Sequence, residues 1–186
     1  MKKFLIGFGI VIGILFLLVV IMVGVMAFII SSNNKDKGEY SKNLAGPDSL
    51  APKALVVYQS SIRSTGKTIA EKIAAGLNDK GYDVTISYPG DKLSEDISSY
   101  SIIAFGSSVY AGQPSSALIG YMKRVTDYSG KKVLIYSIGS ADNTPELDLL
   151  EDAIKGNAEI TKTKFKAAAK DNGDIAYKLG TDLAAQ

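Results

Sequence analysis

The chain has 186 residues, with 21 basic and 19 acidic side chains and neither cysteine nor histidine. This composition excludes disulfides, thiolate metal sites and nucleophiles paired with histidine. The length allows one ordinary domain and little more. Residues 53–186 carry 16 basic and 16 acidic side chains, so this part has no net charge, and we expect no nucleic-acid partner.

The chain begins with an apolar stretch. Residues Phe4–Ile30 contain no charged side chain, and as a helix they would be roughly 40 Å long at about 1.5 Å per residue. That length exceeds the hydrocarbon core of a bilayer, which is about 30 Å thick. A cleavable signal peptide has an apolar region of only about 7–15 residues that ends in a small-residue cleavage site, and neither condition fits. We therefore predict a retained, single-pass membrane anchor over residues 1–30.

Basic residues flank the apolar stretch on both sides. Lys2 and Lys3 precede it, and Lys35, Lys37 and Lys42 follow it. Because the positive-inside rule counts basic residues near the span, the two flanks nearly balance and leave the orientation open. The lack of acidic residues before the span slightly favours an inside N-terminus, which would put the domain outside the cytoplasm.

A polar segment follows, from residue 31 to residue 52. It is rich in Ser, Asn, Lys, Gly and Asp and is interrupted by Gly46-Pro47, a composition typical of a flexible linker. From residue 53 to residue 186, predicted strands and helices alternate, as in a parallel sheet covered on both faces. We therefore expect one α/β domain after the linker.

The elements of this domain are predicted from hydrophobic periodicity and from cap and turn residues. The predicted strands are Lys53–Gln59, Tyr82–Tyr88, Tyr100–Gly106, Lys131–Ile138 and Ala158–Lys166. The second of them is expected at an edge of the sheet, and the fifth is expected to face solvent. The predicted helices are Lys67–Lys80, a short piece near Leu93–Ser98, Ser115–Thr126, a helix capped by Thr144 with Pro145 at its first position, and Asp174–Ala185.

The loop after the first strand has the composition of a phosphate site. Its candidate ligands are Ser60, Ser61, Arg63, Ser64, Thr65, Gly66, Lys67 and Thr68. The first N–H groups of the following helix lack internal partners and carry the positive end of the helix dipole, which favours a bound anion. Helix capping is the plain alternative, but it explains one or two hydroxyls rather than a run of them.

Two other classes of phosphate-handling protein are disfavoured. Gly66-Lys67-Thr68 matches the tail of a nucleotide-binding P-loop, but the leading glycine would fall at position 61, which is Ser. A phosphorylated receiver would need acidic residues after the first strand and an Asp after the third. Those positions hold Gln59, Ser60, Gly106 and Ser107.

The loop after the third strand suits a flat ring. Its candidate residues are Ser107, Ser108, Val109, Tyr110, Ala111 and Gly112. Ligands of open α/β sheets bind beyond the carboxyl ends of the strands, where the winding direction reverses. If the first and third strands flank that point, the two loops share one crevice, in which Tyr110 offers a face for stacking. The two loops together predict a nucleotide-like ligand.

With these motifs, the domain resembles the flavodoxin-like family over about Lys53–Ala184. Thr65-Gly66-Lys67-Thr68 is similar to the family's T-G-N-T phosphate motif, and Phe105–Gly112 looks like the loop that packs against the isoalloxazine ring. Gly139–Asn143, with Gly139 and Asp142, falls where the third flavin-contacting loop should be. The resemblance implies an open, doubly wound, five-stranded parallel sheet of order 2-1-3-4-5. It also implies FMN as the cofactor.

The resemblance further implies that the Ala111-Gly112 peptide changes its backbone contact when the flavin is reduced. We therefore predict a membrane-tethered FMN electron carrier whose redox partner is a membrane protein or a quinone-type carrier. The domain also resembles quinone-dependent protoporphyrinogen oxidase. This second resemblance implies a quinone-linked flavin oxidoreductase as the alternative function. No catalytic side chain and no metal ligand are assigned, and the oligomeric state is left open.

Overall fold

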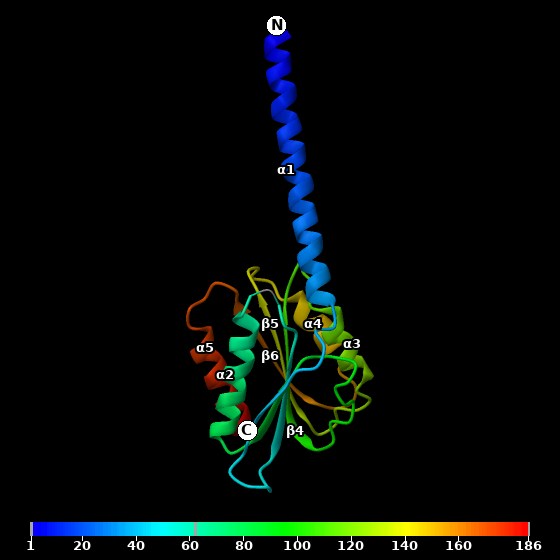
Figure 1. Cartoon of the computed structure of the whole chain (residues 1–186). Helices are drawn as coiled ribbons and strands as arrows, with labels where there is room; N and C mark the ends of the chain where they lie inside the picture. The colour runs from blue at the N-terminus through cyan, green and yellow to red at the C-terminus, as the bar shows by residue number, and fades with distance from the viewer. Residues whose placement is uncertain (1, 62, 186) are drawn as a thin grey trace.

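The computed structural model describes residues 2–61 and 63–185, so Met1, Ile62 and Gln186 lie outside the described part. Within that part the chain forms five helices and a six-stranded sheet. A long helix, α1 (Lys2–Asn34), stands clear of the α/β domain below it (Figure 1). Among the described residues, it is the one helix long and apolar enough to cross a membrane. The candidate span is Ile6–Asn34, in which an 18-residue window has a mean hydropathy of 3.2.

Five parallel strands make up most of the sheet. In spatial order they are β3 (Asp83–Ser87), β2 (Lys53–Tyr58), β4 (Tyr100–Ser108), β5 (Lys132–Gly139) and β6 (Glu159–Lys166). This is the predicted order 2-1-3-4-5, and the doubly wound sheet is therefore confirmed. The three central strands β2, β4 and β5 are buried on both faces because apolar side chains point to both faces.

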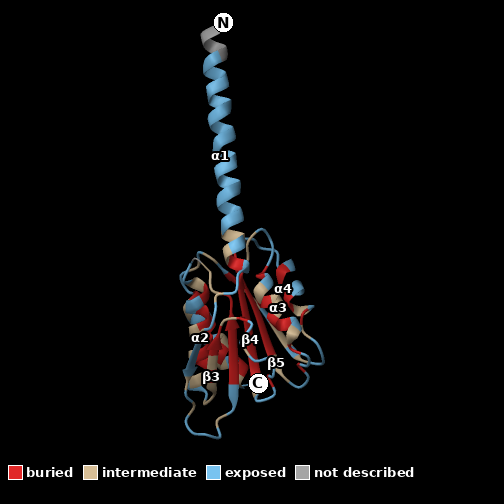
Figure 2. Ribbon diagram, turned by 45° about the vertical axis from the view of Figure 1, so that its right-hand side comes forward, coloured by how far each residue is buried: buried red, intermediate tan, exposed pale blue. Residues whose placement is uncertain are grey.

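Helices cover the two faces of the sheet. On one face lie α2 (Thr65–Asp79) and α5 (Asn172–Ala185), which bury Ile69, Ile73, Ala176 and Leu183 against it. On the other face lie α3 (Ser116–Arg124) and α4 (Pro145–Glu151), which bury Leu118, Met122, Leu147 and Leu150. Figure 2 shows the result, a buried sheet between helices that are exposed on their outer sides.

The segment expected to be a flexible linker, residues 31–52, has a defined structure instead. Its first residues continue α1, and β1 (Ser41–Leu44) pairs antiparallel with β3 as a sixth strand. The predicted edge position of Tyr82–Tyr88 is therefore wrong, since β1 covers that edge. Side chains from distant parts of the domain hold the segment, and composition alone does not reveal them. Gln59 Nε2 donates to Lys35 O (2.9 Å), Ser87 Oγ to Tyr40 O (2.8 Å) and Asn78 Nδ2 to Ala45 O (2.8 Å).

The short helical piece expected near Leu93–Ser98 is also absent from the described residues, where turns take its place. Side chains there bind the local backbone: Asp96 N donates to Ser94 Oγ (3.1 Å), and Ser98 N donates to Asp96 Oδ1 (2.9 Å). Such contacts compete with the helical hydrogen bonds and favour turns.

Two glycines allow α2 and α5 to approach closely. A Cβ added at Gly180 would lie 2.2 Å from Ile73 O, and one added at Gly76 would lie 2.3 Å from Tyr177 O. Both obstacles are backbone atoms of the facing helix, so a side chain fits at neither position without moving a helix. The distance between these two helices thus depends on the absence of two side chains.

We expect Gly180→Ala to lower the free energy of unfolding by about 1–3 kcal/mol, the usual cost of overpacking. Gly120→Ala in α3 is the matched control, because no described atom lies within 4 Å of the added Cβ. The free energy of unfolding of this control should rise by about 0.5–1 kcal/mol, because Ala has a higher helix propensity than Gly. Urea unfolding of the full chain in detergent, followed by far-UV circular dichroism, measures both variants. Equal effects of the two substitutions would contradict this account of the helix contact.

Candidate functional site

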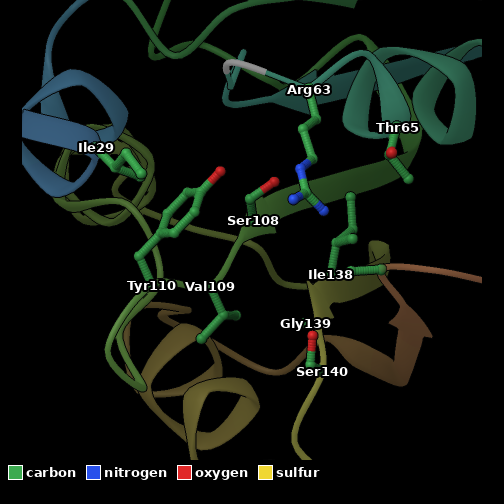
Figure 3. Close-up of a pocket in the computed structure, with 10 residues that line it drawn as sticks. Ile29, Arg63, Thr65, Ser108, Val109, Tyr110, Ile138, Gly139 and Ser140 are labelled. Atoms are coloured by element: carbon green, nitrogen blue, oxygen red, sulfur yellow. The ribbon is translucent and has the colours of Figure 1, made fainter. Parts of the chain in front are cut away.

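A cleft of about 430 Å³ opens at the carboxyl edge of the sheet, where β2, β4 and β5 end. Small-molecule sites have volumes of about 300–1,000 Å³, so the cleft has the size of a ligand site. Three loops and the end of α1 meet there (Figure 3). The lining residues are Ile29, Arg63, Thr65, Ser108, Val109, Tyr110, Ile138, Gly139, Ser140 and Ala167.

The N-terminus of α2 forms one end of the cleft. Ser64 is the N-cap residue, yet among the described residues its side chain makes no capping hydrogen bond. The first backbone donor of this turn with a described partner is Thr68 N, which donates to Ser64 O (2.9 Å). Among the described residues, the hydroxyls of this loop therefore do not cap α2. The first N–H groups of α2, with Arg63 and Thr65 in the cleft wall beside them, suit an anion.

Several predicted phosphate ligands hold the loop together instead of lining the cleft. Ser61 Oγ donates to Arg63 O (3.0 Å), Ser108 Oγ donates to Ser61 Oγ (3.3 Å), and Thr68 Oγ1 donates to Ser64 O (3.3 Å). Ser60, Gly66 and Lys67 are likewise outside the described lining. Ile62, in the middle of this predicted loop, lies outside the described residues.

The loop after β4 makes a tight turn next to the cleft. Gln113 N donates to Tyr110 O (3.0 Å), and Tyr110 N donates to Gln113 O (3.1 Å). The two central residues, Ala111 and Gly112, have φ values of 51° and 76°, the signs of a type I′ turn. Among the described residues Ala111 is the one non-glycine with positive φ, a conformation that costs roughly 1–2 kcal/mol. Strain of this kind concentrates at functional sites.

Buried serines position this loop. Ser107 Oγ accepts a hydrogen bond from Ser115 N (2.8 Å) and donates to Ser108 O (2.9 Å). Ser107 is 1% exposed, so this predicted ring contact supports the loop rather than facing the cleft. Tyr110 and Val109 do line the cleft, across from Arg63 and Thr65 (Figure 3).

A buried ion pair supports the third loop, between β5 and α4. Lys164 Nζ lies 2.7 Å from Glu146 Oε1, and the two side chains are only 8% and 2% exposed. Ser137 Oγ donates to the same carboxylate (2.7 Å), and Lys164 Nζ donates to Asn143 O (2.7 Å). Gly139, a predicted flavin contact, lines the cleft. Asp142 lies on the surface in an ion pair with Lys166, whose hydrogen bond lowers the pKa of the Asp142 carboxyl.

The end of α1 also reaches the site, which the sequence analysis did not anticipate. Ile29 lines the cleft, and Asn33 Nδ2 donates to Ser108 O (3.4 Å). The backbone oxygen of Asn33 accepts a hydrogen bond from Ser115 Oγ (2.8 Å). About 80 residues separate these partners in the chain, and no local pattern pairs them. Ile138, Ser140 and Ala167 were missed as well, because they adjoin predicted elements without carrying distinctive chemistry.

Comparison with known proteins agrees with this geometry. A family model described as a flavodoxin domain matches residues 55–179. The chain belongs to this family. Flavodoxins of Megasphaera elsdenii and Streptococcus pneumoniae both superpose on it with a TM-score of 0.58, at 20% and 18% identity. The superpositions cover 72% of this chain and 99% and 98% of those flavodoxins, and they show the flavodoxin fold.

A curated relative is also similar in sequence. An uncharacterised protein of Methanocaldococcus jannaschii is 33% identical over 86 residues, which are 46% of this chain. The aligned part spans about half of that relative, 53% of its length. Membership of the flavodoxin family indicates flavin-based electron transfer for the domain.

The ion pair below the third loop makes the stability of the flavodoxin domain depend on pH. Burial raises the pKa of the Glu146 carboxyl, but hydrogen bonds from Lys164 and Ser137 outweigh it and leave the pKa below its ordinary value. The ordinary value is about 4.3. The contribution of Glu146 to stability is therefore complete above that pH and is lost as the pH falls through the lowered value.

We expect Lys164→Met to lower the free energy of unfolding at pH 7 by about 3–5 kcal/mol, because Glu146 would stay buried without its cation. The unpaired carboxyl should then have a raised pKa, so the loss should shrink as the pH falls towards 5. Lys162→Met is the control: Lys162 pairs with two exposed carboxylates, Asp148 (2.9 Å) and Glu151, and its loss should cost at most about 1 kcal/mol. Guanidinium unfolding at pH 7 and 5 measures both. Similar losses for the two lysines would show that the buried pair has no special role.

Proposed function

We propose that this protein is a membrane-anchored flavodoxin that binds FMN in the cleft and transfers electrons. One observation carries the proposal: loops from three adjacent central strands enclose a single cleft with an anion-binding end and an aromatic end. The anion-binding end has a guanidinium and the first N–H groups of α2, which have no partner among the described residues, and this combination suits a phosphate. The other end has Tyr110, Val109 and the backbone of Gly139, which suits a flat ring.

The residues of the chain have separate tasks in this proposal. The N–H groups of α2, the Thr65 hydroxyl and Arg63 hold the phosphate, whose charge Arg63 offsets. Tyr110 and Val109 cover the ring, while Ser107 and Ser115 keep their loop in place. When bound, FMN supplies the one- and two-electron chemistry, and the protein sets its potential. The peptide between Ala111 and Gly112 is suited to a redox-dependent rotation, because glycine adopts either sign of φ at low cost.

The anchoring part of the proposal rests on α1. Its side chains from Ile6 to Phe28 are largely exposed and apolar, which is stable in lipid and unfavourable in water. The helix then continues without a break to Asn34 and packs on the domain. A segment removed by a signal peptidase would not be expected to carry buried contacts of the mature domain. This supports retention of α1 as a single membrane span.

We expect the full chain, purified in detergent, to take up FMN and to show the absorbance bands of a bound flavin. The full chain is needed because Ser41–Leu44 pair with the sheet and Gln59 holds the backbone of Lys35. Titration of FMN fluorescence, which falls on binding, gives the dissociation constant. A folded chain that neither changes the spectrum nor quenches added FMN would overturn the proposed function.

Thr65→Asp tests the phosphate end. A carboxylate against the phosphate should weaken FMN binding by at least about a hundredfold, since like charges in contact cost several kcal/mol. The same carboxylate in the first turn of α2 should stabilise the apoprotein by about 0.3–1 kcal/mol, so lost binding cannot be ascribed to misfolding. Thr65→Ser keeps the hydroxyl and should bind within about threefold of the wild type. Unchanged affinity in Thr65→Asp would refute the assignment of this loop.

One observation favours a second candidate function, a quinone-linked flavin oxidoreductase. A second cleft of about 780 Å³ opens at the same edge of the sheet, beyond the end of β3. Its lining includes Tyr40 and Tyr88, whose stacked rings lie 4.6 Å apart, and this volume accommodates an organic substrate. Steady-state assays of the FMN-loaded chain with a quinone and candidate donors distinguish the two functions. Turnover without any added redox protein would favour the enzyme, and its absence would favour the carrier.

A further inference from the structure

The end of the apolar helix is attached to the cofactor edge of the domain by buried contacts. Asn33 is 4% exposed and uses both its side chain and its backbone, through Ser108 and Ser115. Asn34 Oδ1 accepts from Ser116 N (3.0 Å), and Gln59, which is 1% exposed, holds Lys35 O. Polar groups buried in this way lose their water, and they regain hydrogen bonds only while the helix stays in place. The junction therefore has one arrangement rather than the freedom of a tether.

The cleft also lies close to the level at which the apolar run ends. The run extends to Ile30, and Ile29 lines the cleft. The uncharged stretch, roughly 40 Å long as a helix, is longer than the hydrocarbon core of about 30 Å. No polar spacer therefore separates the lipid from the cleft along α1. The cleft mouth lies within about two helical turns of the lipid surface.

The direction of α1 sets how the domain faces the membrane. Figures 1 and 2 show α1 leaving the carboxyl edge of the sheet and continuing in the direction of the strands. The loops after β4 and β5 rise beside its last turns. The loop that contains Leu50, 91% exposed, lies at the opposite end of the domain. The carboxyl edge, with the cleft, thus faces the bilayer.

Within the cleft, Ile29 lies on the same side as Tyr110, across from Arg63 and Thr65 (Figure 3). This is the end that suits the ring rather than the phosphate. Asn33, one helical turn further on, holds Ser108 at the start of the ring loop. The last turns of α1 thus adjoin the place where the ring would lie, both directly and through that loop.

We propose that the last two turns of α1 are part of the flavin site, with Ile29 as a wall of the ring pocket and Asn33 positioning the ring loop. This proposal rests on the function proposed above. The same turns fix the mouth of the cleft at the membrane surface. Redox partners then reach the flavin from the lipid or along its surface, and a large carrier from bulk water is kept away by the bilayer. The neutral domain agrees with this, because it lacks the charge that steers soluble partners.

FMN titration of the full chain in phospholipid nanodiscs tests whether Ile29 is a wall of the ring pocket. Ile29→Ala removes apolar area from the ring pocket and should weaken FMN binding about fivefold or more. Phe28→Ala is the matched control: Phe28 is the preceding residue of the same helix and is 69% exposed, so affinity should stay within about twofold. Equal affinities of the wild type and Ile29→Ala would overturn the assignment of Ile29.

A second measurement tests the orientation without FMN, and the lack of native cysteine makes it direct. A fluorophore attached to Ser140→Cys, in the cleft lining, should be strongly quenched by lipids that carry a nitroxide on the head group. The same fluorophore on Leu50→Cys should be little affected. The double variant Asn33→Ala with Ser115→Ala should reduce the quenching at position 140, whereas Ser101→Ala at the opposite edge should not.

The two measurements separate the two proposals. If the wild type binds FMN but the label at position 140 is quenched no more than the label at position 50, the membrane-facing site is wrong and the proposed function stands. If no FMN binds while the label at position 140 is quenched, the proposed function fails and the orientation of the domain stands.

Discussion

Parallel pairing of β2 between β3 and β4 is the constraint on which the site depends. It makes the chain wind outward in both directions from β2 and β4, so the loops that follow these strands diverge and leave a crevice at their carboxyl ends. β5 adds a third loop at the same edge. The three loops that line the cleft are held by this order of strands, which apolar side chains on both faces of the central strands stabilise.

The three loops are supported in different ways, and each support matches a task. The loop before α2 uses hydroxyls to bind its own backbone, which leaves helix N–H groups for an anion. The loop after β4 is held by buried serines and ends in a strained turn at Ala111. The loop after β5 rests on the ion pair of Lys164 and Glu146. Rigid support beneath exposed residues is what a cofactor site requires, since a preorganised site loses less entropy on binding.

In the proposed function, the membrane anchor and the cofactor site meet at a junction of few residues. Helix α1 is apolar up to the point where it contacts the domain, and the strand β1 that follows it closes the sheet at β3. The buried contacts of Asn33 fix the domain relative to the end of α1, and in the proposed function they therefore fix it relative to the membrane. Its attachment and its site share residues, of which Ser108 is the clearest example, because Ser108 lines the cleft and its backbone oxygen accepts a hydrogen bond from the Asn33 amide.

The order of the five parallel strands was implied by the resemblance to the flavodoxin-like family. The sequence by itself determined the α/β class, the long apolar helix and the positions of the three loops. These features depend on local periodicity, on caps and on the rule that ligands bind at the carboxyl edge. Only the tertiary structure decided that Ser41–Leu44 join the sheet, that Ser61 and Thr68 face their own loop, and that Ile29 reaches the cleft. These outcomes depend on contacts between residues far apart in the chain, such as Asn33 with Ser115 and Asn78 with Ala45. The composition of the chain near either partner does not predict such a contact.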